Sequence, residues 1–178
     1  MNLPNKLTII RVLFIPFFMF FIMNDGIRYA PIIALAIYVV ASLTDTLDGY
    51  IARKYKLITD FGKFMDPLAD KLLVTASLIC FVELGFINSW IAMVIIAREL
   101  IITGFRTLAA SKGITLAANN WGKLKTIFQM ITIILVLLLN AGLPYDLWIA
   151  TTVLWTITVI LTLLSGTIYI LENKSVLK

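Results

Sequence analysis

Four aspartates stand at spacings that can bring their carboxylates together. Asp45 and Asp48 are three residues apart, and Asp66 and Asp70 are four residues apart. Residues three or four apart on an α-helix share one face, so each pair can present two carboxylates on the same side of a helix. The stretch between the two pairs is short, which favours an antiparallel helical hairpin in which the two acidic faces meet.

Such a cluster indicates a site for divalent cations. Carboxylates at close range repel one another and burial raises the cost, whereas a bound cation removes it. The chain has no histidine and a single cysteine, Cys80, so hard oxygen ligands favour Mg²⁺, Mn²⁺ or Ca²⁺ over zinc. Four carboxylates suit two ions, and two-ion sites stabilise phosphoryl groups during transfer. The alternative is a set of solvated aspartates at helix ends, paired with lysine or arginine.

Small residues and an arginine accompany the aspartates. Gly49 follows Asp48 directly, Ala52 lies three residues further on, and Gly62 precedes Asp66 by four residues. A glycine within a helix costs about 1 kcal/mol relative to alanine, and it is tolerated where a ligand or another backbone comes close. Arg53 lies one turn beyond Gly49, where its guanidinium can bind a phosphate. Helix packing alone is the alternative explanation for each small residue.

The composition indicates that lipid surrounds the elements that carry these residues. Hydrophobic residues make up 61% of the 178 residues and charged residues only 14%, against roughly 45–50% and about 25% in soluble domains. A membrane-spanning helix needs about 20 mostly apolar residues. Six segments qualify: about Leu7–Met23, Tyr29–Tyr50, Phe64–Leu84, Ile87–Ala110, Leu124–Ala141 and Leu147–Leu171. The sequence therefore predicts one all-α integral membrane domain over residues 1–178, with six transmembrane helices and the active site at the cytoplasmic ends of helices 2 and 3.

The basic residues predict the orientation of these segments. If the segments alternate, one side of the membrane receives Lys6, Arg53, Lys54, Lys56, Lys63, Lys112, Lys123, Lys125, Lys174 and Lys178. The other side receives Arg28 alone. Because cytoplasmic loops carry an excess of lysine and arginine, we expect a multi-pass protein of the cytoplasmic membrane with both termini in the cytoplasm. Arg11 interrupts the first apolar run, and no small-residue cleavage site follows it, so no cleavable signal peptide is expected.

The aspartates and their neighbours form one continuous motif. It reads Asp45-x-x-Asp48-Gly49-x-x-Ala52-Arg53, then eight residues, then Gly62-x-x-x-Asp66-x-x-x-Asp70. This motif resembles the signature of the CDP-alcohol phosphatidyltransferase family in every residue type and spacing, and the six-helix layout is similar too. The resemblance implies transfer of a phosphatidyl or related group from a CDP-linked donor to an alcohol, with release of CMP. It also implies two divalent ions, Mg²⁺ or Mn²⁺, and a homodimer.

The resemblance also implies roles for individual residues. The metal ligands it implies are Asp45, Asp48, Asp66 and Asp70, with Asp70 also the catalytic base. The donor, CDP-diacylglycerol, is expected to contact Thr8, Arg11, Gly49, Arg53, Thr59 and Gly62. Thr59 is equally a candidate N-cap for the third helix. No serine, cysteine or histidine nucleophile lies in the motif, so we expect direct displacement without a covalent intermediate.

Cationic residues outside the motif favour an anionic acceptor. The flanking stretches Asn2–Arg11, Ala97–Leu100 and Gly122–Thr126 look like those of the bacterial branch of the family that uses sn-glycerol 3-phosphate. We expect its phosphate to bind among four cations: Arg98, Arg106, Lys123 and Lys125. Arg98 and Arg106 are eight residues apart, roughly on one side of a helix. Snorkelling of Lys123 and Lys125 and an ion pair of one arginine with Glu99 stay open as alternatives.

Two other functions are compatible with the pattern. Within the family, the acceptor of a cardiolipin or phosphatidylinositol-phosphate synthase is the runner-up to glycerol 3-phosphate. From a different class, a divalent-cation transporter would use the aspartates as an ion path. A transporter predicts acids near the bilayer midplane and an inverted repeat, and no second aspartate set occurs in the C-terminal half. The net charge of +5 fits contact with anionic lipid, and nucleic acid is not an expected partner.

Overall fold

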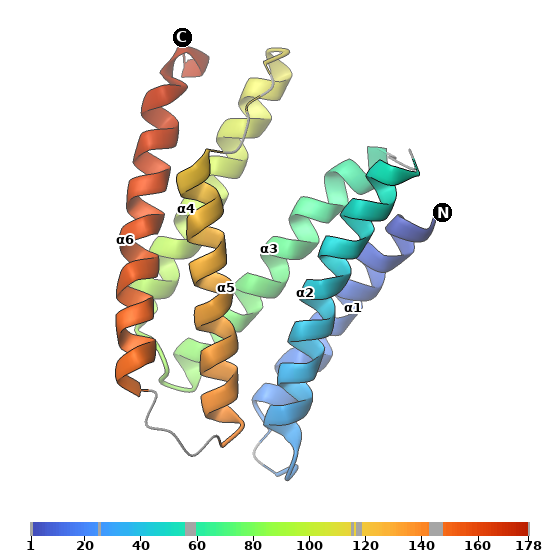
Figure 1. Ribbon diagram of the computed structural model, residues 1–178, viewed down its shortest axis with the longest axis vertical. Helices are drawn as coiled ribbons and strands as arrows, with labels where there is room; N and C mark the ends of the chain where they lie inside the picture. Colours follow the sequence, from blue (N-terminus) through green and yellow to red (C-terminus); the bar gives the residue numbers. More distant parts are fainter. Residues whose placement is uncertain are drawn as a thin grey trace. The chain divides into compact units, whose positions relative to one another are not determined.

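The computed structural model of the chain describes residues 2–24, 26–55, 60–114, 116, 119–142 and 148–177. The side chains at positions 3, 4, 45–53, 60, 61, 63, 64, 66, 67, 175 and 177 lie outside the description. Its helices are α1 (Leu3–Ile22), α2 (Ala30–Lys54), α3 (Asp60–Glu83), α4 (Ser89–Ser111), α5 (Asn120–Asn140), α6 (Trp148–Glu172) and the short 3-10 helix η1 (Lys174–Leu177) (Figure 1). Since these described parts contain no strand, the all-α prediction is confirmed.

Within the described residues, three helices are apolar and long enough to cross a membrane. The qualifying stretches are Asn5–Ile22 in α1, Asn120–Asn140 in α5 and Trp148–Glu172 in α6. The described apolar part of α2, Ala30–Thr44, is shorter, and α4 carries Arg98, Glu99 and Arg106 within its length. At 1.5 Å per residue, α2, α3 and α4 are still each longer than about 30 Å, the thickness of a hydrocarbon core. The protein is thus a membrane protein, while the count of six spans stays a prediction.

The helices form two compact units. The first comprises Met1–Phe86 with Leu137–Pro144, and the second comprises Ile87–Val136 with Tyr145–Lys178.

In the first unit, α1 packs against both α2 and α3, and α2 also contacts α3 (Figure 1). The face of α2 that is buried repeats every three or four residues, with Ala30, Ala34, Tyr38 and Ala41 all at most 1% exposed. Three of these four side chains are a single methyl group, so the neighbouring helix backbones can approach closely. The Tyr38 ring packs against that of Phe18 on α1, with centroids 5.9 Å apart.

In the second unit, α4 and α6 lie side by side (Figure 1). Ile102, Phe105 and Ala109 of α4 form an apolar cluster with Tyr169 of α6 and Val176 of η1. Nearer the start of α6, three polar side chains are fully buried: Thr158, Thr162 and Ser165. The Thr158 hydroxyl lies 3.3 Å from that of Thr132 on α5. In lipid, such hydroxyl contacts and small residues hold helices together.

Polar side chains cap the starts of three helices, and a glycine follows the end of α4. Asn2, Asn88 and Asn119 accept hydrogen bonds from backbone N–H groups in the first turns of α1, α4 and α5. Gly113 follows α4 with φ of 72°, a left-handed conformation that glycine adopts without a steric cost. The N–H of Ile114 then donates to the Ala109 carbonyl, which closes the helix end.

Candidate active site

The two helices that carry the aspartates have the backbone that the spacing predicts. Asp45 and Asp48 lie within α2, and Asp66 and Asp70 lie within α3, so each pair is on one face of a helix. Only residues 55–59 separate the end of α2 from the start of α3. With the contact between α2 and α3 in the first unit, this short connection gives the predicted helical hairpin.

Asp70 is the aspartate whose side chain the structure describes. It is half-buried on α3, the helix that contacts α2. The side chains of Asp45, Asp48 and Asp66 lie outside the described residues, as does the whole of Thr59. Among the described residues, no three His, Cys, Asp or Glu side chains gather as a metal site would require. The donor set itself, four carboxylates on two contacting helices without imidazole or thiolate, fits a hard divalent cation.

Three of the residues expected to bind the donor have described surroundings, and all three are buried. Gly62 is buried on α3, while the side chain of Arg53 and the surroundings of Gly49 lie outside the described residues. Thr8 and Arg11 lie on α1 and are fully buried, with 0% and 1% of their surface exposed. Their burial within the first unit is a feature that the sequence did not predict.

Arg11 reaches from α1 to the backbone of α2. Its Nε donates a hydrogen bond to the Ala41 carbonyl at 3.3 Å. The hydroxyl of Thr44, one turn along α2, donates to the same carbonyl at 2.7 Å. In an α-helix, the carbonyl of residue 41 is also the acceptor for the N–H of residue 45. Arg11 therefore contacts α2 at the turn in which Asp45 begins the acidic face.

The cations expected to bind the acceptor lie in the second unit. Arg98 of α4 donates from Nη2 to the Ser165 hydroxyl of α6 at 3.1 Å and from Nη1 to Glu99 Oε1 at 3.3 Å. A Cβ added at Gly166 would lie 3.2 Å from Arg98 Cγ, and one added at Gly122 would lie 3.5 Å from Arg98 Nη2. The absence of side chains at these two positions on α6 and α5 leaves the room that the guanidinium occupies.

Lys125 completes this group from α5. Its ammonium is bonded to the Glu99 carboxylate, and the side chain is 1% exposed. A lysine this deeply buried does not snorkel, so that alternative is wrong for Lys125. The ion pair between Glu99 and Arg98 is confirmed, with a second cation on the same carboxylate oxygen. Two cations and one carboxylate leave a net positive charge in this region of the unit.

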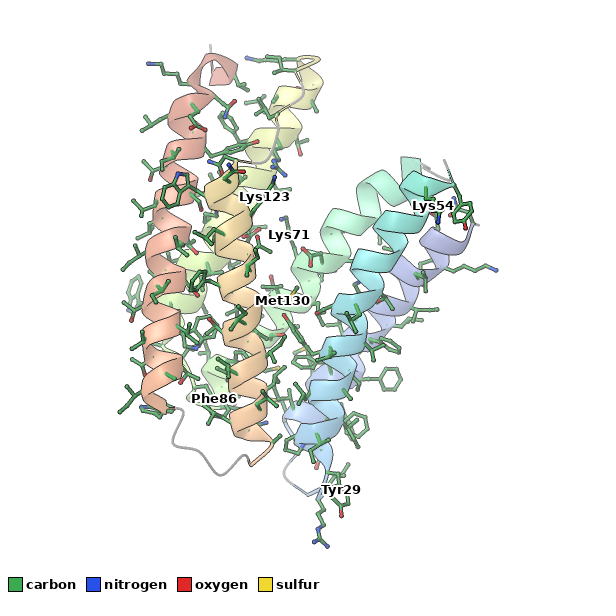
Figure 2. The ribbon with its side chains drawn as sticks, viewed as in Figure 1. Tyr29, Lys54, Lys71, Phe86, Lys123 and Met130 are labelled. Atoms are coloured by element: carbon green, nitrogen blue, oxygen red, sulfur yellow. The ribbon has the colours of Figure 1, made fainter. Side chains whose placement is uncertain are left out.

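Arg106 and Lys123 are more accessible. Arg106 is exposed, donates from Nε to the Tyr169 hydroxyl at 3.0 Å, and has its guanidinium carbon 5.4 Å from the centre of the Tyr169 ring. Arg98 and Arg106 both reach α6, which confirms that they share one side of α4. Lys123 is exposed in the first turns of α5, where Figure 2 labels it.

Two donors around Arg98 are left without a hydrogen-bond partner among the described residues. They are Arg98 Nε and Asn119 Nδ2, and both atoms are buried. Asn119 Oδ1 caps α5 by accepting from the N–H of Gly122 at 2.8 Å. Buried donors are normally satisfied, and an anion satisfies donors that face it. This group of cations and unpaired donors therefore suits an anionic ligand.

The sequence interpretation missed the contribution of α6. Ser165, Gly166 and Tyr169 contact the two arginines, yet none of them is charged. The available signal was the repeat of small and polar residues along α6, in which Thr158, Thr162 and Ser165 recur every three or four positions in an otherwise apolar segment. Polar residues inside a membrane helix face the interior of a bundle.

Comparison with known proteins agrees with the motif. Residues 1–164 match the family model of the CDP-alcohol phosphatidyltransferases. The CDP-diacylglycerol–glycerol-3-phosphate 3-phosphatidyltransferase of Bacillus subtilis is 41% identical, over 99% of this chain and 97% of its own length. The protein of the same name from Rickettsia typhi is 37% identical, over 98% of both chains. A probable phosphatidylglycerophosphate synthase of Mycobacterium tuberculosis is 36% identical, over 95% of this chain and 80% of its own.

The family match spans both acidic helices and the cationic group on α4 and α5, and the relatives extend over nearly the full length. The chain therefore belongs to the CDP-alcohol phosphatidyltransferase family and is a membrane enzyme of that class.

Proposed function

We propose that the protein transfers the phosphatidyl group from CDP-diacylglycerol to sn-glycerol 3-phosphate and releases phosphatidylglycerophosphate and CMP. The observation that carries this proposal is the similarity over 98–99% of the chain to relatives named for that reaction. The cationic group of Arg98 and Lys125, with its buried unpaired donors, supports an acceptor that bears a phosphate.

Divalent cations are part of the proposal. Enzymes of this family generally depend on them. The residues that would hold two ions, Mg²⁺ or Mn²⁺, are Asp45, Asp48, Asp66 and Asp70. When bound, the ions would neutralise charge on the donor diphosphate and on the leaving CMP. Carboxylates on two contacting helices suit this role, because both helices would supply oxygen ligands to the ions.

Asp70 is proposed as the base. Its carboxylate takes a proton from a hydroxyl of glycerol 3-phosphate, and that oxygen then forms a bond to the phosphorus that bears the diacylglycerol. The bond from this phosphorus to the CMP oxygen breaks, and CMP leaves with the electron pair. The partial exposure of Asp70 supports access for an acceptor hydroxyl.

The remaining residues bind and orient the two substrates. For the donor we propose contacts from Gly49, Arg53, Thr59 and Gly62, with Thr8 on the adjoining helix α1. For the acceptor phosphate we propose Arg98, Arg106, Lys123 and Lys125. The exposed pair, Arg106 and Lys123, meets the phosphate first, and the less exposed pair, Arg98 and Lys125, fixes it. A single domain with six spans, a homodimer and both termini in the cytoplasm complete the proposal.

A radiolabelled-acceptor assay on purified protein tests the acceptor. CDP-diacylglycerol and Mg²⁺ are held constant while glycerol 3-phosphate, inositol phosphate, phosphatidylglycerol and serine are compared by CMP release. We expect turnover with glycerol 3-phosphate to exceed that with each other acceptor. Preferred use of inositol phosphate or phosphatidylglycerol would reassign the chain within its family. Ion flux into vesicles without CMP release would instead support a transporter.

A further inference from the structure

A buried arginine in α1 stands apart from the rest of that helix. The helix is apolar along most of its length, yet Asn5, Thr8 and Arg11 are buried on it, three residues apart. An intramembrane arginine is costly, so its retention indicates a specific use. With 1% of its surface exposed, Arg11 is enclosed by the helices of the first unit rather than presented to a headgroup or to lipid.

The hydrogen bond from Arg11 to the α2 backbone indicates a structural role for this side chain. The Arg11 Nε binds the carbonyl of Ala41, which also receives the Thr44 hydroxyl. Ala41 is fully buried, and its small side chain lets α1 come close to the α2 backbone at this level. Two side-chain donors on one carbonyl fix the position and rotation of that turn. Asp45 lies four residues after Ala41, so its backbone N–H is the helical hydrogen-bond donor to the same carbonyl.

We infer that Arg11 is a positioning residue that fixes the α2 turn leading to Asp45 and Asp48, and that it acts on the metal site through α2 rather than by touching CDP-diacylglycerol. This inference rests on the metal site of the proposed function. A shift of about 1 Å in a catalytic group is enough to impair a site. Rotation of α2 at Ala41 moves both aspartates together, because they share one rigid helix.

The test measures metal binding in the absence of both substrates. Mn²⁺ is titrated into the purified full-length protein, and free Mn²⁺ is followed by electron paramagnetic resonance. We expect Arg11→Met to weaken Mn²⁺ binding about tenfold, the lower end for loss of a charge-assisted hydrogen bond. Arg11→Lys keeps the charge and a donor, so its Mn²⁺ affinity should stay within about threefold of wild type. Thr44→Val should shift the affinity in the same direction, by about threefold.

Two control variants separate positioning from general effects. Lys6→Met removes one positive charge from the same helix but from an exposed side chain. Ser77→Ala removes a buried α3 hydroxyl that donates to the Leu73 carbonyl of its own helix. Both should bind Mn²⁺ as wild type does. Size-exclusion profiles and thermal unfolding identify the folded fraction of each variant. A folded Arg11→Met protein with unchanged Mn²⁺ affinity but weakened binding of CDP-diacylglycerol would overturn the inference in favour of direct donor contact.

The remaining outcomes are also decisive. If Arg11→Met does not fold, Thr44→Val carries the test, and wild-type Mn²⁺ affinity in that variant would overturn the inference. If the wild-type protein binds no Mn²⁺, the metal site of the proposed function fails, which is distinguishable from failure of the Arg11 contact alone.

Discussion

At the scale of single residues, the chemistry depends on how the helices divide charges between them. The four aspartates proposed to bind metal belong to α2 and α3, and the cations proposed to bind the acceptor phosphate belong to α4 and α5. Neutral residues set the geometry of both groups. The Ala41 carbonyl accepts a hydrogen bond from Arg11, and the Ser165 hydroxyl accepts one from Arg98. Substitutions can therefore separate residues that react, residues that bind and residues that hold others in place.

The first prediction at this scale concerns Asp70→Asn. The amide keeps the shape of the side chain and one oxygen ligand but cannot accept the proton of the acceptor hydroxyl. We expect folding and donor binding to survive while turnover falls at least about a hundredfold, within the range for a lost general base. CMP release and donor binding are measured at several Mn²⁺ concentrations. Near-wild-type turnover at saturating metal would transfer the role of base to another group.

Asp45→Asn and Asp48→Asn serve as comparison variants for this experiment. Each removes a proposed ligand charge without removing the proposed base. Their activity should recover in part as the concentration of Mg²⁺ or Mn²⁺ is raised, whereas that of Asp70→Asn should not.

A second prediction concerns the acceptor phosphate. Arg106→Ala removes an exposed guanidinium, and we expect the KM for glycerol 3-phosphate to rise roughly ten- to a hundredfold, as for loss of a charge-assisted contact. The KM for CDP-diacylglycerol should change little. Tyr169→Phe removes only the hydroxyl that receives Arg106 Nε, so a smaller rise is expected. Equal losses for both substrates would indicate a defect in folding or in donor binding instead.

At the scale of helices, close approach between elements decides where the charged side chains lie. Gly166 of α6 faces Arg98 of α4, and a Cβ there would meet Arg98 Cγ at 3.2 Å. Gly104, on α4 itself, has no atom within 4 Å of such a Cβ among the described residues. The two glycines thus offer matched positions at which the same substitution has different consequences.

Gly166→Val should push Arg98 away from Ser165 and raise the KM for glycerol 3-phosphate about tenfold, because the guanidinium loses its fixed orientation. Gly104→Val should leave this KM unchanged. Both variants introduce the same β-branched residue into a helix, so the helix-propensity cost is matched. Steady-state kinetics with glycerol 3-phosphate as the varied substrate checks the difference. Similar KM values for the two variants would mean that Gly166 does not set the position of Arg98.

The helices were predictable from sequence, whereas most contacts between them were not. Apolar runs of 20 residues predict membrane helices directly, but they miss the polar turns at helix ends. α2 continues past Tyr50 to Lys54, and α3 begins at Asp60 rather than near Phe64. α5 likewise begins at Asn120, four residues before Leu124, because Asn119 caps a polar first turn. The pairing of Arg98 with Ser165, 67 residues away, depends on packing that no local pattern encodes.

In the candidate site, too, local features were predictable from the sequence and contacts between helices were not. The four aspartates were recognisable because their i,i+3 and i,i+4 spacing is a local property of each helix. The burial of Arg11 and Lys125 could not be predicted from the sequence, because burial of a cation depends on which helices surround it. In Figure 2, Tyr29 lies just before α2 and Lys54 at the other end of that helix.

At the scale of the whole molecule, the prediction is the topology. The sorting of lysine and arginine predicts that positions 56 and 112 face the cytoplasm, and that positions 24 and 140 face the opposite side. Single cysteines are introduced at each position, with Cys80 left in place because it is buried. A membrane-impermeant thiol reagent added to intact cells should modify only positions 24 and 140. External modification at position 112 would contradict the six-span arrangement.

The charges of α4 bear on how the chain enters the bilayer in the first place. α4 is described throughout, yet it is not among the helices that are apolar enough to cross a membrane, since Arg98, Glu99 and Arg106 lie within it. A growing chain delivers its helices in order of synthesis, so α4 emerges before α5 and α6 bring Lys125, Ser165 and Tyr169. We therefore expect the insertion machinery to retain α4 until α6 has been made, so that the residues proposed to recognise the acceptor also set the order of biogenesis.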